Sequence, residues 1–186
     1  MLTDKINAVN KLYGNLDRHM SAFKRRSCIQ CRAGCGECCL KADLNATVLE
    51  FLPAAHSLYM NGDYEQVLDR INDKSDPLCV FFNPFSAGGN CSMYRERGLI
   101  CRLFGYSGRM NKQGVKEFVT CSIIKEDLKT LNPGPVLDLA PNMSSYYMRL
   151  YGIDPDLSIK YLPINQAIQK AIELVAFDSG YRKRPA

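Results

Sequence analysis

The sequence predicts an α+β fold: a small, mainly helical single domain with two short β-hairpins. Three observations predict it. The chain has 186 residues, of which 46% are hydrophobic and 23% charged, and this is the size and composition of one globular domain. Apolar residues recur at helical spacing in several segments, and short apolar runs flank two glycine-containing turns. No linker, repeat or low-complexity segment divides the chain, so residues 1–186 are expected to form a single domain.

The first segment is expected to form a helix that follows Thr3 as its N-cap. The helix ends in the basic residues 24–26, whose charge suits the negative end of a helix dipole. Apolar side chains recur along it at spacings of three and four, and these are Ile6, Val9, Leu12, Tyr13, Leu16, Met20 and Phe23.

Two shorter helices are predicted next. Thr47, with Glu50 three residues later, forms a capping box, and Pro53 constrains the first turns of the helix that this box opens. Asp63 and Gln66 repeat the same device before a second apolar run, which predicts a helix over 63–72.

Two hairpins are predicted in the middle of the chain. The runs 80–82 and 91–94 flank a glycine-rich turn at 86–90. A second pair of strands, 102–109 and 115–121, is expected to be joined through 111–114.

The C-terminal part is expected to be helical over about 143–178. A short helix is predicted near 143–151, and the last helix is expected to begin at Pro163, a residue that suits the first helical position. One face of that helix carries Ile164, Ile168, Ala171, Ile172 and Val175. The basic residues 182–184 are expected to be frayed.

Composition and charge exclude several classes of protein. The N-terminal residues are polar where a signal peptide needs an apolar stretch, and no apolar run approaches the roughly 18 residues of a membrane span. We therefore expect a cytoplasmic protein without membrane contact. The net charge is +5, but most basic residues are scattered, so nucleic-acid binding is not expected. Phosphate loops, dinucleotide fingerprints and nucleophile elbows are absent from the sequence.

The cysteines are the most informative feature of the sequence. There are 9 cysteines but only 2 histidines. Such clustered thiols in a reducing compartment usually bind metal or perform redox chemistry, so all are candidate metal ligands. A first, dense set is Cys28, Cys31, Cys35, Cys38 and Cys39, and a dispersed second set is Cys79, Cys91, Cys101 and Cys121.

The spacing of the dense set suits convergence on metal. Cys35 and Cys38 enclose two residues, which lets two thiolates hold one ion, and Gly36 between them permits the positive φ that such a turn often uses. The adjacent Cys38 and Cys39 point to opposite sides of an extended backbone, an arrangement that suits two metals or a polynuclear centre.

The identity of the metal has two readings. Thiolates select zinc or iron–sulfur clusters, and a dense run of cysteines is more typical of cluster-binding loops than of structural zinc sites. Nine thiols exceed one four-coordinate site, so the alternatives are two sites, one polynuclear site, or some structural thiols. Cys79 and Cys121 lie in apolar stretches and suit the core equally well. We expect cysteine-bound metal to staple the fold, and metal-free protein to lose much of its structure.

The cysteine pattern resembles a known family. The C-G-x-C-C step at 35–39 precedes a second block at 79–104, in which C-x2-Y-x2-R is followed by C-R-x-F. Together they resemble the YkgJ-type cysteine-cluster family of zinc- or iron-chelating domains over about 28–121. Val80 and Gly98 replace the family's usual prolines, and Cys28 and Cys31 are alternatives for the first ligand. The resemblance implies bound metal or an iron–sulfur cluster but no settled reaction, although a similar domain occurs in flagellin lysine methylases.

Two arginines of the second block are predicted to bind the cofactor. Arg97 and Arg102 would donate hydrogen bonds to cluster thiolates or to an anionic substrate, because donors around a metal site tune it. The alternative is ordinary surface charge. His19 and His56 are expected to be surface or boundary residues without a ligand role.

These observations predict an iron–sulfur protein with a redox or accessory role in a modification pathway. One alternative is a zinc-stapled module that binds a protein partner, and another is a metalloenzyme of unknown substrate. A protein partner is expected, and the oligomeric state stays open. The preferred ligands are Cys35, Cys38, Cys39, Cys91 and Cys101, followed by Cys31, Cys28, Cys79 and Cys121.

Overall fold

The computed structural model describes most of the chain, namely residues 1–29, 31, 36–41, 43–73, 78–85, 89–121, 124–126, 128 and 134–182. Helices dominate it, as predicted. The longer helices are α1 (Leu2–Ser27), α2 (Leu52–Asn61), α3 (Tyr64–Asn72), α7 (Met143–Tyr151) and α9 (Ile164–Arg182). Shorter turns are the 3-10 helix η1 (Leu49–Phe51), α4 (Leu99–Leu103), α6 (Gly134–Leu137) and α8 (Pro155–Ser158).

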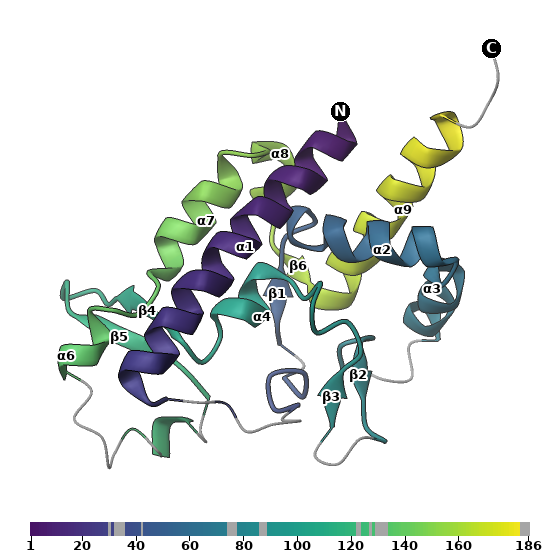
Figure 1. Cartoon of the computed structure of the whole chain (residues 1–186). Coiled ribbons are helices and arrows are strands. Elements are labelled where there is room, and N and C mark those ends of the chain that lie inside the picture. Colours follow the sequence, from purple (N-terminus) through teal and green to yellow (C-terminus); the bar gives the residue numbers. More distant parts are fainter. Residues whose placement is uncertain are drawn as a thin grey trace.

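The helices pack around α1 and α2. Helix α7 lies along one side of α1, and α2 crosses between α1 and α9 (Figure 1). The N-terminus and the C-terminal end of α9 lie at the same end of the molecule, while the cysteine-bearing loops lie toward the other end (Figure 1).

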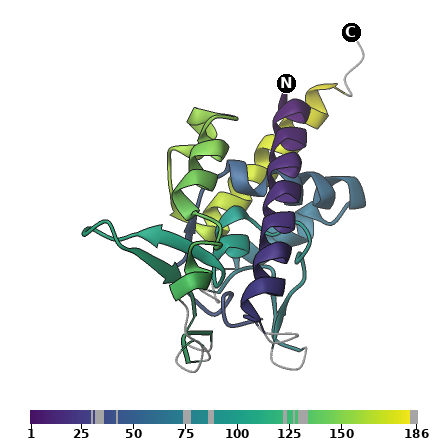
Figure 2. The ribbon, with the colours of Figure 1, turned by 60° about the vertical axis from the view of Figure 1, so that its left-hand side comes forward.

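The strands form three short antiparallel pairs. Strands β2 (Phe82–Asn83) and β3 (Asn90–Cys91) make the first predicted hairpin, and β4 (Ser107–Met110) and β5 (Lys116–Val119) make the second. Hairpin β4–β5 projects from the body of the molecule (Figure 2). The third pair, β1 (Asn45–Ala46) with β6 (Leu162–Pro163), was not predicted because each strand has only two residues.

The apolar faces predicted for the first and last helices form the core. All seven apolar residues predicted for the face of α1 are buried, and so are the five predicted for α9. Phe51 and Leu52, where η1 meets α2, are buried between these helices at 1% and 0% exposure. Burial of these faces, rather than local helix propensity, is what stabilises the arrangement.

Several element boundaries differ from the predictions, among them the strands of both hairpins, which are shorter or shifted by one or two residues. Met1, not Thr3, precedes the first helical residue, so Thr3 lies inside α1. The strand expected from 102 begins at Ser107, because residues 99–103 form α4. Pro163 ends β6 and the last helix begins one residue later. Residues 183–184 of the basic tail lie outside the described residues, and Arg182 is the last residue of α9.

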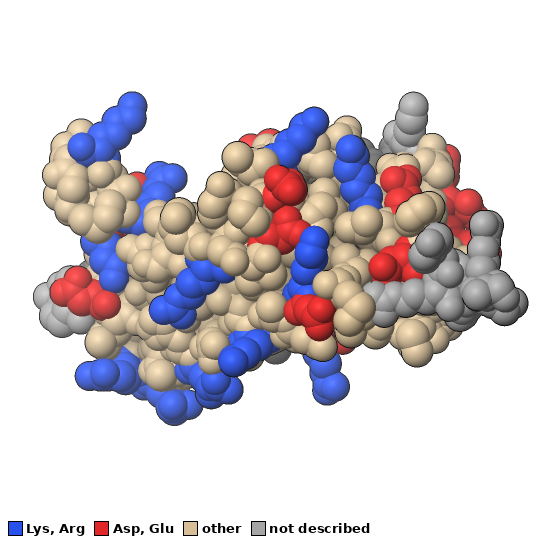
Figure 3. Space-filling view, turned by 90° about the horizontal axis from the view of Figure 1, so that it is seen from above, with Lys and Arg blue, Asp and Glu red and all other residues tan. Residues whose placement is uncertain are grey.

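The described helices and the charged surface concern the predictions about membranes and nucleic acids. Within the described residues, no helix is both long and apolar enough to cross a membrane. Acidic and basic side chains are interspersed over much of the face seen from above, and basic ones gather along one edge of that view (Figure 3). The expectation that nucleic acid is not a partner stays a prediction.

Candidate metal centre

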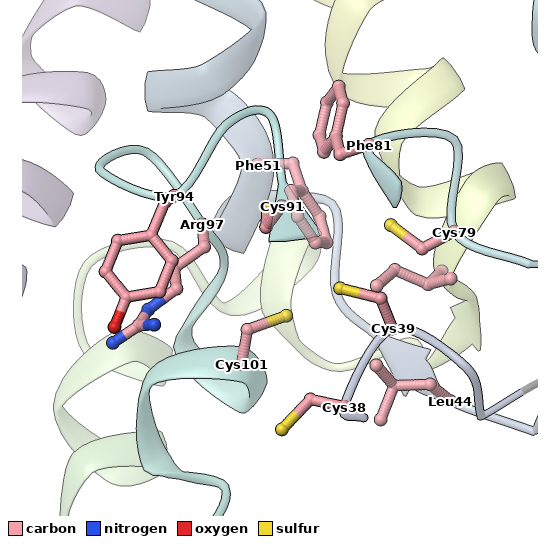
Figure 4. A pocket seen from close by; sticks show the side chains of 11 residues that line it. Cys38, Cys39, Leu44, Phe51, Cys79, Phe81, Cys91, Tyr94, Arg97 and Cys101 are labelled. Carbon is pink, nitrogen blue, oxygen red and sulfur yellow. The ribbon is translucent and has the colours of Figure 1, made fainter. Parts of the chain in front are cut away.

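Five cysteines from separate parts of the chain line one pocket. Cys38 and Cys39 belong to the dense set, and the second set contributes three more from the start of hairpin β2–β3, from β3 and from α4. Figure 4 shows these side chains around the pocket, whose cavity is about 40 Å³. The described residues that line it are Cys38, Cys39, Leu44, Phe51, Cys79, Phe81, Cys91, Tyr94, Arg97, Cys101 and Ile164.

A close backbone approach brings the dense set against hairpin β2–β3. A Cβ atom on Gly36 would lie 2.7 Å from Phe82 Cε2 and 3.0 Å from the backbone of Gly89. Gly36 does not have the positive φ that was expected of it. A glycine is required at position 36 for a different reason, because any side chain there would collide with the hairpin. The Cys39 N–H donates to the Gly36 carbonyl (2.8 Å), and this turn presents Cys38 and Cys39 beside the hairpin.

A buried carboxylate positions the helix that carries Cys101. Helix α4 follows Gly98, which has no side chain to cap it, and the Ile100 N–H donates to Glu50 Oε2 (2.8 Å). The other oxygen of Glu50 accepts from the Thr47 N–H (2.9 Å) and the Thr47 hydroxyl (3.2 Å). Glu50 therefore makes its half of the predicted capping box, but the Thr47 hydroxyl donates to Glu50 and caps no backbone N–H; Val48, not Thr47, is the N-cap of η1. Glu50 also caps α4. Burial raises the pKa of Glu50 to about 7, although these hydrogen bonds oppose the rise.

The sulfurs are arranged around a common space. Figure 4 shows the sulfurs of Cys39, Cys79 and Cys101 directed toward the space between them, whereas Cys38 directs its sulfur away. Cys38 and Cys39 therefore direct their sulfurs differently, as predicted, but from a turn rather than from extended backbone. Among the residues that the structure describes, no three Cys, His, Asp or Glu side chains stand close enough to hold an ion without adjustment. The all-sulfur donor set fits zinc or an iron–sulfur cluster.

The pocket favours neutral thiols at most of its cysteines. The hydrogen bond between the Cys39 and Cys91 thiols raises the pKa of Cys39, with burial adding to it. The same bond lowers the pKa of Cys91 to about 7, and the Arg97 charge contributes. Burial raises the pKa of Cys79 to about 12. Burial also raises the pKa of Cys101 well above its usual value. Several thiolates together in this pocket would therefore need a compensating cation.

The other predicted cysteine ligands lie elsewhere. Cys28 and Cys31 are exposed after the end of α1 and do not line the pocket. Cys121 is buried away from it and accepts a hydrogen bond from the Ile124 N–H (3.5 Å). Cys35 lies outside the described residues. A ligand role for these four stays a prediction.

The two arginines predicted to bind a cofactor have different surroundings. Arg97 lines the pocket and its guanidinium carbon lies 4.0 Å from the centre of the Tyr94 ring. Arg102 is only 5% exposed and does not line it. Its Nε donates to the Arg97 carbonyl (3.0 Å), its Nη1 to Asp17 (2.6 Å), and its Nη2 to the Arg95 carbonyl. Arg102 therefore organises the loop that carries Arg97, and its predicted cofactor contact stays a prediction.

Neither histidine lines the pocket. His19 Nδ1 lies 3.1 Å from the Tyr146 hydroxyl, and His56 is exposed on α2. Sequence reasoning missed Leu44, Ile164 and the role of Glu50 in capping α4. Leu44 follows the dense cysteine set closely, but a single leucine does not indicate a pocket, and Ile164 was predicted only as part of the apolar face of the last helix. Only the capping box gave any signal for the role of Glu50.

The family comparison agrees with this geometry. The chain matches the family model CxxCxxCC, described as "putative zinc- or iron-chelating domain", over residues 30–123, and all five pocket cysteines lie inside that range. No curated protein matches the chain, and neither does any solved structure. Because the matched residues cover half of the chain and include the pocket, the chain belongs to the CxxCxxCC family of zinc- or iron-chelating domains.

Proposed function

We propose that the pocket cysteines hold an iron–sulfur cluster and that the protein has a redox or accessory role in a modification pathway. The observation that carries the proposal is that cysteines from four separate segments line one pocket, with the sulfurs of Cys39, Cys79 and Cys101 directed into it. Iron–sulfur clusters are held by cysteine thiolates, and four are the usual complement. Cys39, Cys79, Cys91 and Cys101 are the proposed ligands.

The surroundings of the cysteines support this proposal. The remaining wall is mostly apolar, with Leu44, Phe51, Phe81 and Ile164. Such a wall limits solvent access to a bound cluster and so influences its reduction potential. Arg97 is the cation of the described lining, and its charge favours the thiolate of Cys91. The bound cluster would supply electron transfer, while these residues bind it and exclude water.

A second candidate is a single zinc ion that staples the loops for a protein partner. The observation that favours it is the cavity volume of about 40 Å³, which accommodates one ion more readily than a polynuclear cluster. Tetrahedral cysteine coordination is common for structural zinc. This alternative needs no redox role, and a catalytic role would require an open coordination position.

Anaerobic purification followed by quantification of iron, acid-labile sulfide and zinc distinguishes the candidates. The proposal predicts iron with matching sulfide and a broad visible absorption band. Colourless protein with one zinc per chain would replace the first candidate with the second. Freshly prepared protein with neither metal would refute both.

A further inference from the structure

A second cavity adjoins the candidate metal centre. It lies between the C-terminal half of α1 and the loop that precedes α4, two segments that lie side by side in Figure 1, and its volume is about 290 Å³. Tyr94 and Arg97 line both this cavity and the cysteine pocket. The lining consists of Asp17, Met20, Ser21, Lys24, Tyr94, Arg95, Arg97 and Arg102.

The charge of this cavity is strongly positive. Four of its lining residues are Lys or Arg, and Asp17 is the one acidic residue among them. Asp17 is already paired with Arg102, whose Nη1 lies 2.7 and 2.6 Å from its two carboxylate oxygens. The pair leaves Lys24, Arg95 and Arg97 around the cavity without a carboxylate partner among the described residues.

Aromatic rings, rather than carboxylates, hold two of these cations in place. The Lys24 Nζ lies 4.3 Å from the centre of the Tyr106 ring, and the Arg97 guanidinium lies 4.0 Å from that of Tyr94. A ring face attracts the cation but leaves its N–H groups free to donate to a ligand. The Arg97 Nε is buried and has no hydrogen-bond partner among the described residues. A buried donor without a partner is unfavourable, and a bound anion would satisfy it.

The loop that presents the arginines is itself fixed. Arg102 donates to the carbonyls of both Arg95 and Arg97, so a buried cation holds the backbone that carries the other two. The cations are therefore organised before any ligand arrives, which lowers the entropic cost of binding.

We infer that the cavity between α1 and the loop before α4 binds a dianionic oxyanion, such as the phosphate group of a small molecule, beside the metal centre. Three cations without a carboxylate partner favour a doubly charged ligand over a single carboxylate. The planar Arg97 fork and the Lys24 ammonium are the two donor types that commonly bind phosphate oxygens in proteins. The shared Tyr94 and Arg97 place the bound anion directly against the wall of the cysteine pocket.

Calorimetric titration of the full chain with inorganic phosphate at low ionic strength tests this inference. Lys24→Gln and Arg95→Gln should each weaken phosphate binding about tenfold, which corresponds to about 1.4 kcal/mol. Lys24→Arg should bind within about twofold of wild type, because it keeps the charge and a guanidinium can also lie over the Tyr106 ring. Lys11→Gln is the matched control, since Lys11 is exposed on the same helix, does not line the cavity and loses the same charge.

The inference would be overturned if Lys24→Gln and Arg95→Gln bound phosphate as wild type does, or if Lys11→Gln lost as much affinity as they do. Acetate provides a second probe, because a monoanion should bind more weakly than phosphate; equal affinities would refute the preference for a dianion. Iron and zinc are quantified in every variant. Loss of phosphate binding at full metal content separates this inference from the proposed metal centre.

Discussion

The buried carboxylate of Glu50 makes the stability of the protein depend on pH in a direction that can be measured. Glu50 is 0% exposed, and burial raises its pKa from 4.5 to about 7. At about 1.4 kcal/mol for each unit of pKa, this rise changes the free energy of unfolding by about 3 kcal/mol. The folded state therefore binds a proton more tightly at Glu50 than the unfolded state does.

The sign follows from proton linkage. Below the pKa that Glu50 has in the unfolded state, its carboxyl group is protonated in both states and does not change the free energy of unfolding with pH. Between 4.5 and about 7 the folded state retains a proton that the unfolded state has released, so stability falls as the pH rises. Above the folded pKa the full destabilisation of about 3 kcal/mol is present.

Glu50→Gln removes this titration. The amide cannot ionise, but one of its two ends is a donor and will face either Thr47 or Ile100, which also donate. That mismatch destabilises the variant by a roughly constant amount of about 1–3 kcal/mol. The difference in the free energy of unfolding between the variant and wild type should nevertheless shift by about 3 kcal/mol in favour of the variant between about pH 4.5 and about pH 8.

Urea unfolding of both proteins across this pH range measures the shift. Glu65→Gln is the control, because it removes an exposed carboxylate from α3. A Glu50→Gln difference that stayed flat with pH would refute the claim that burial holds a proton on Glu50. A shift of opposite sign would refute it as well.

Three further predictions concern packing, the Arg102 network and the metal. Gly36→Ala should lower the free energy of unfolding by about 1–3 kcal/mol and reduce metal content, because its Cβ would meet Phe82 and the backbone of Gly89. Gly14→Ala, whose Cβ meets nothing within 4 Å in α1, should instead stabilise by about 0.5–1 kcal/mol; equal effects in urea unfolding would contradict this packing argument. Arg102→Lys should destabilise by about 2 kcal/mol, because one ammonium cannot reach Asp17 and two carbonyls together; an unchanged urea midpoint would count against it. Chelation should lower the Tm and reduce near-UV more than far-UV circular dichroism, because α1, α2 and α9 bury their apolar faces against one another; an unchanged Tm would argue against bound metal.

Local patterns in the sequence predicted the helices and hairpins well. The apolar spacing in α1 and α9 is dense enough to identify both the helix and its buried face. Strand pair β1–β6 could not be predicted, because it joins two-residue segments that lie far apart in the sequence. Residues 102–103, the end of helix α4, were assigned to a strand because this short helix has no cap of its own; the cap comes from Glu50 across the fold.

The candidate site was predictable in composition and in part in membership, because the preferred candidates Cys38, Cys39, Cys91 and Cys101 line the pocket. Cysteine spacing identified the ligand type, yet convergence on one pocket depends on contacts between distant segments. The approach of Gly36 to Gly89 illustrates this, because neither residue indicates the other in the sequence. Cys38 and Cys39 were both preferred ligands, but only the Cys39 sulfur is directed into the pocket, and Cys28, a lower-ranked candidate, is exposed outside it (Figure 4).

Whether the cysteine pocket holds the metal is tested most simply by the metal content per chain of three serine variants. Cys39→Ser and Cys101→Ser remove thiols that point into the pocket, whereas Cys28→Ser removes an exposed thiol outside it. The account predicts that the first two lose most of the iron or zinc found in wild type, and that Cys28→Ser retains it. Full metal loading in both Cys39→Ser and Cys101→Ser would contradict the account.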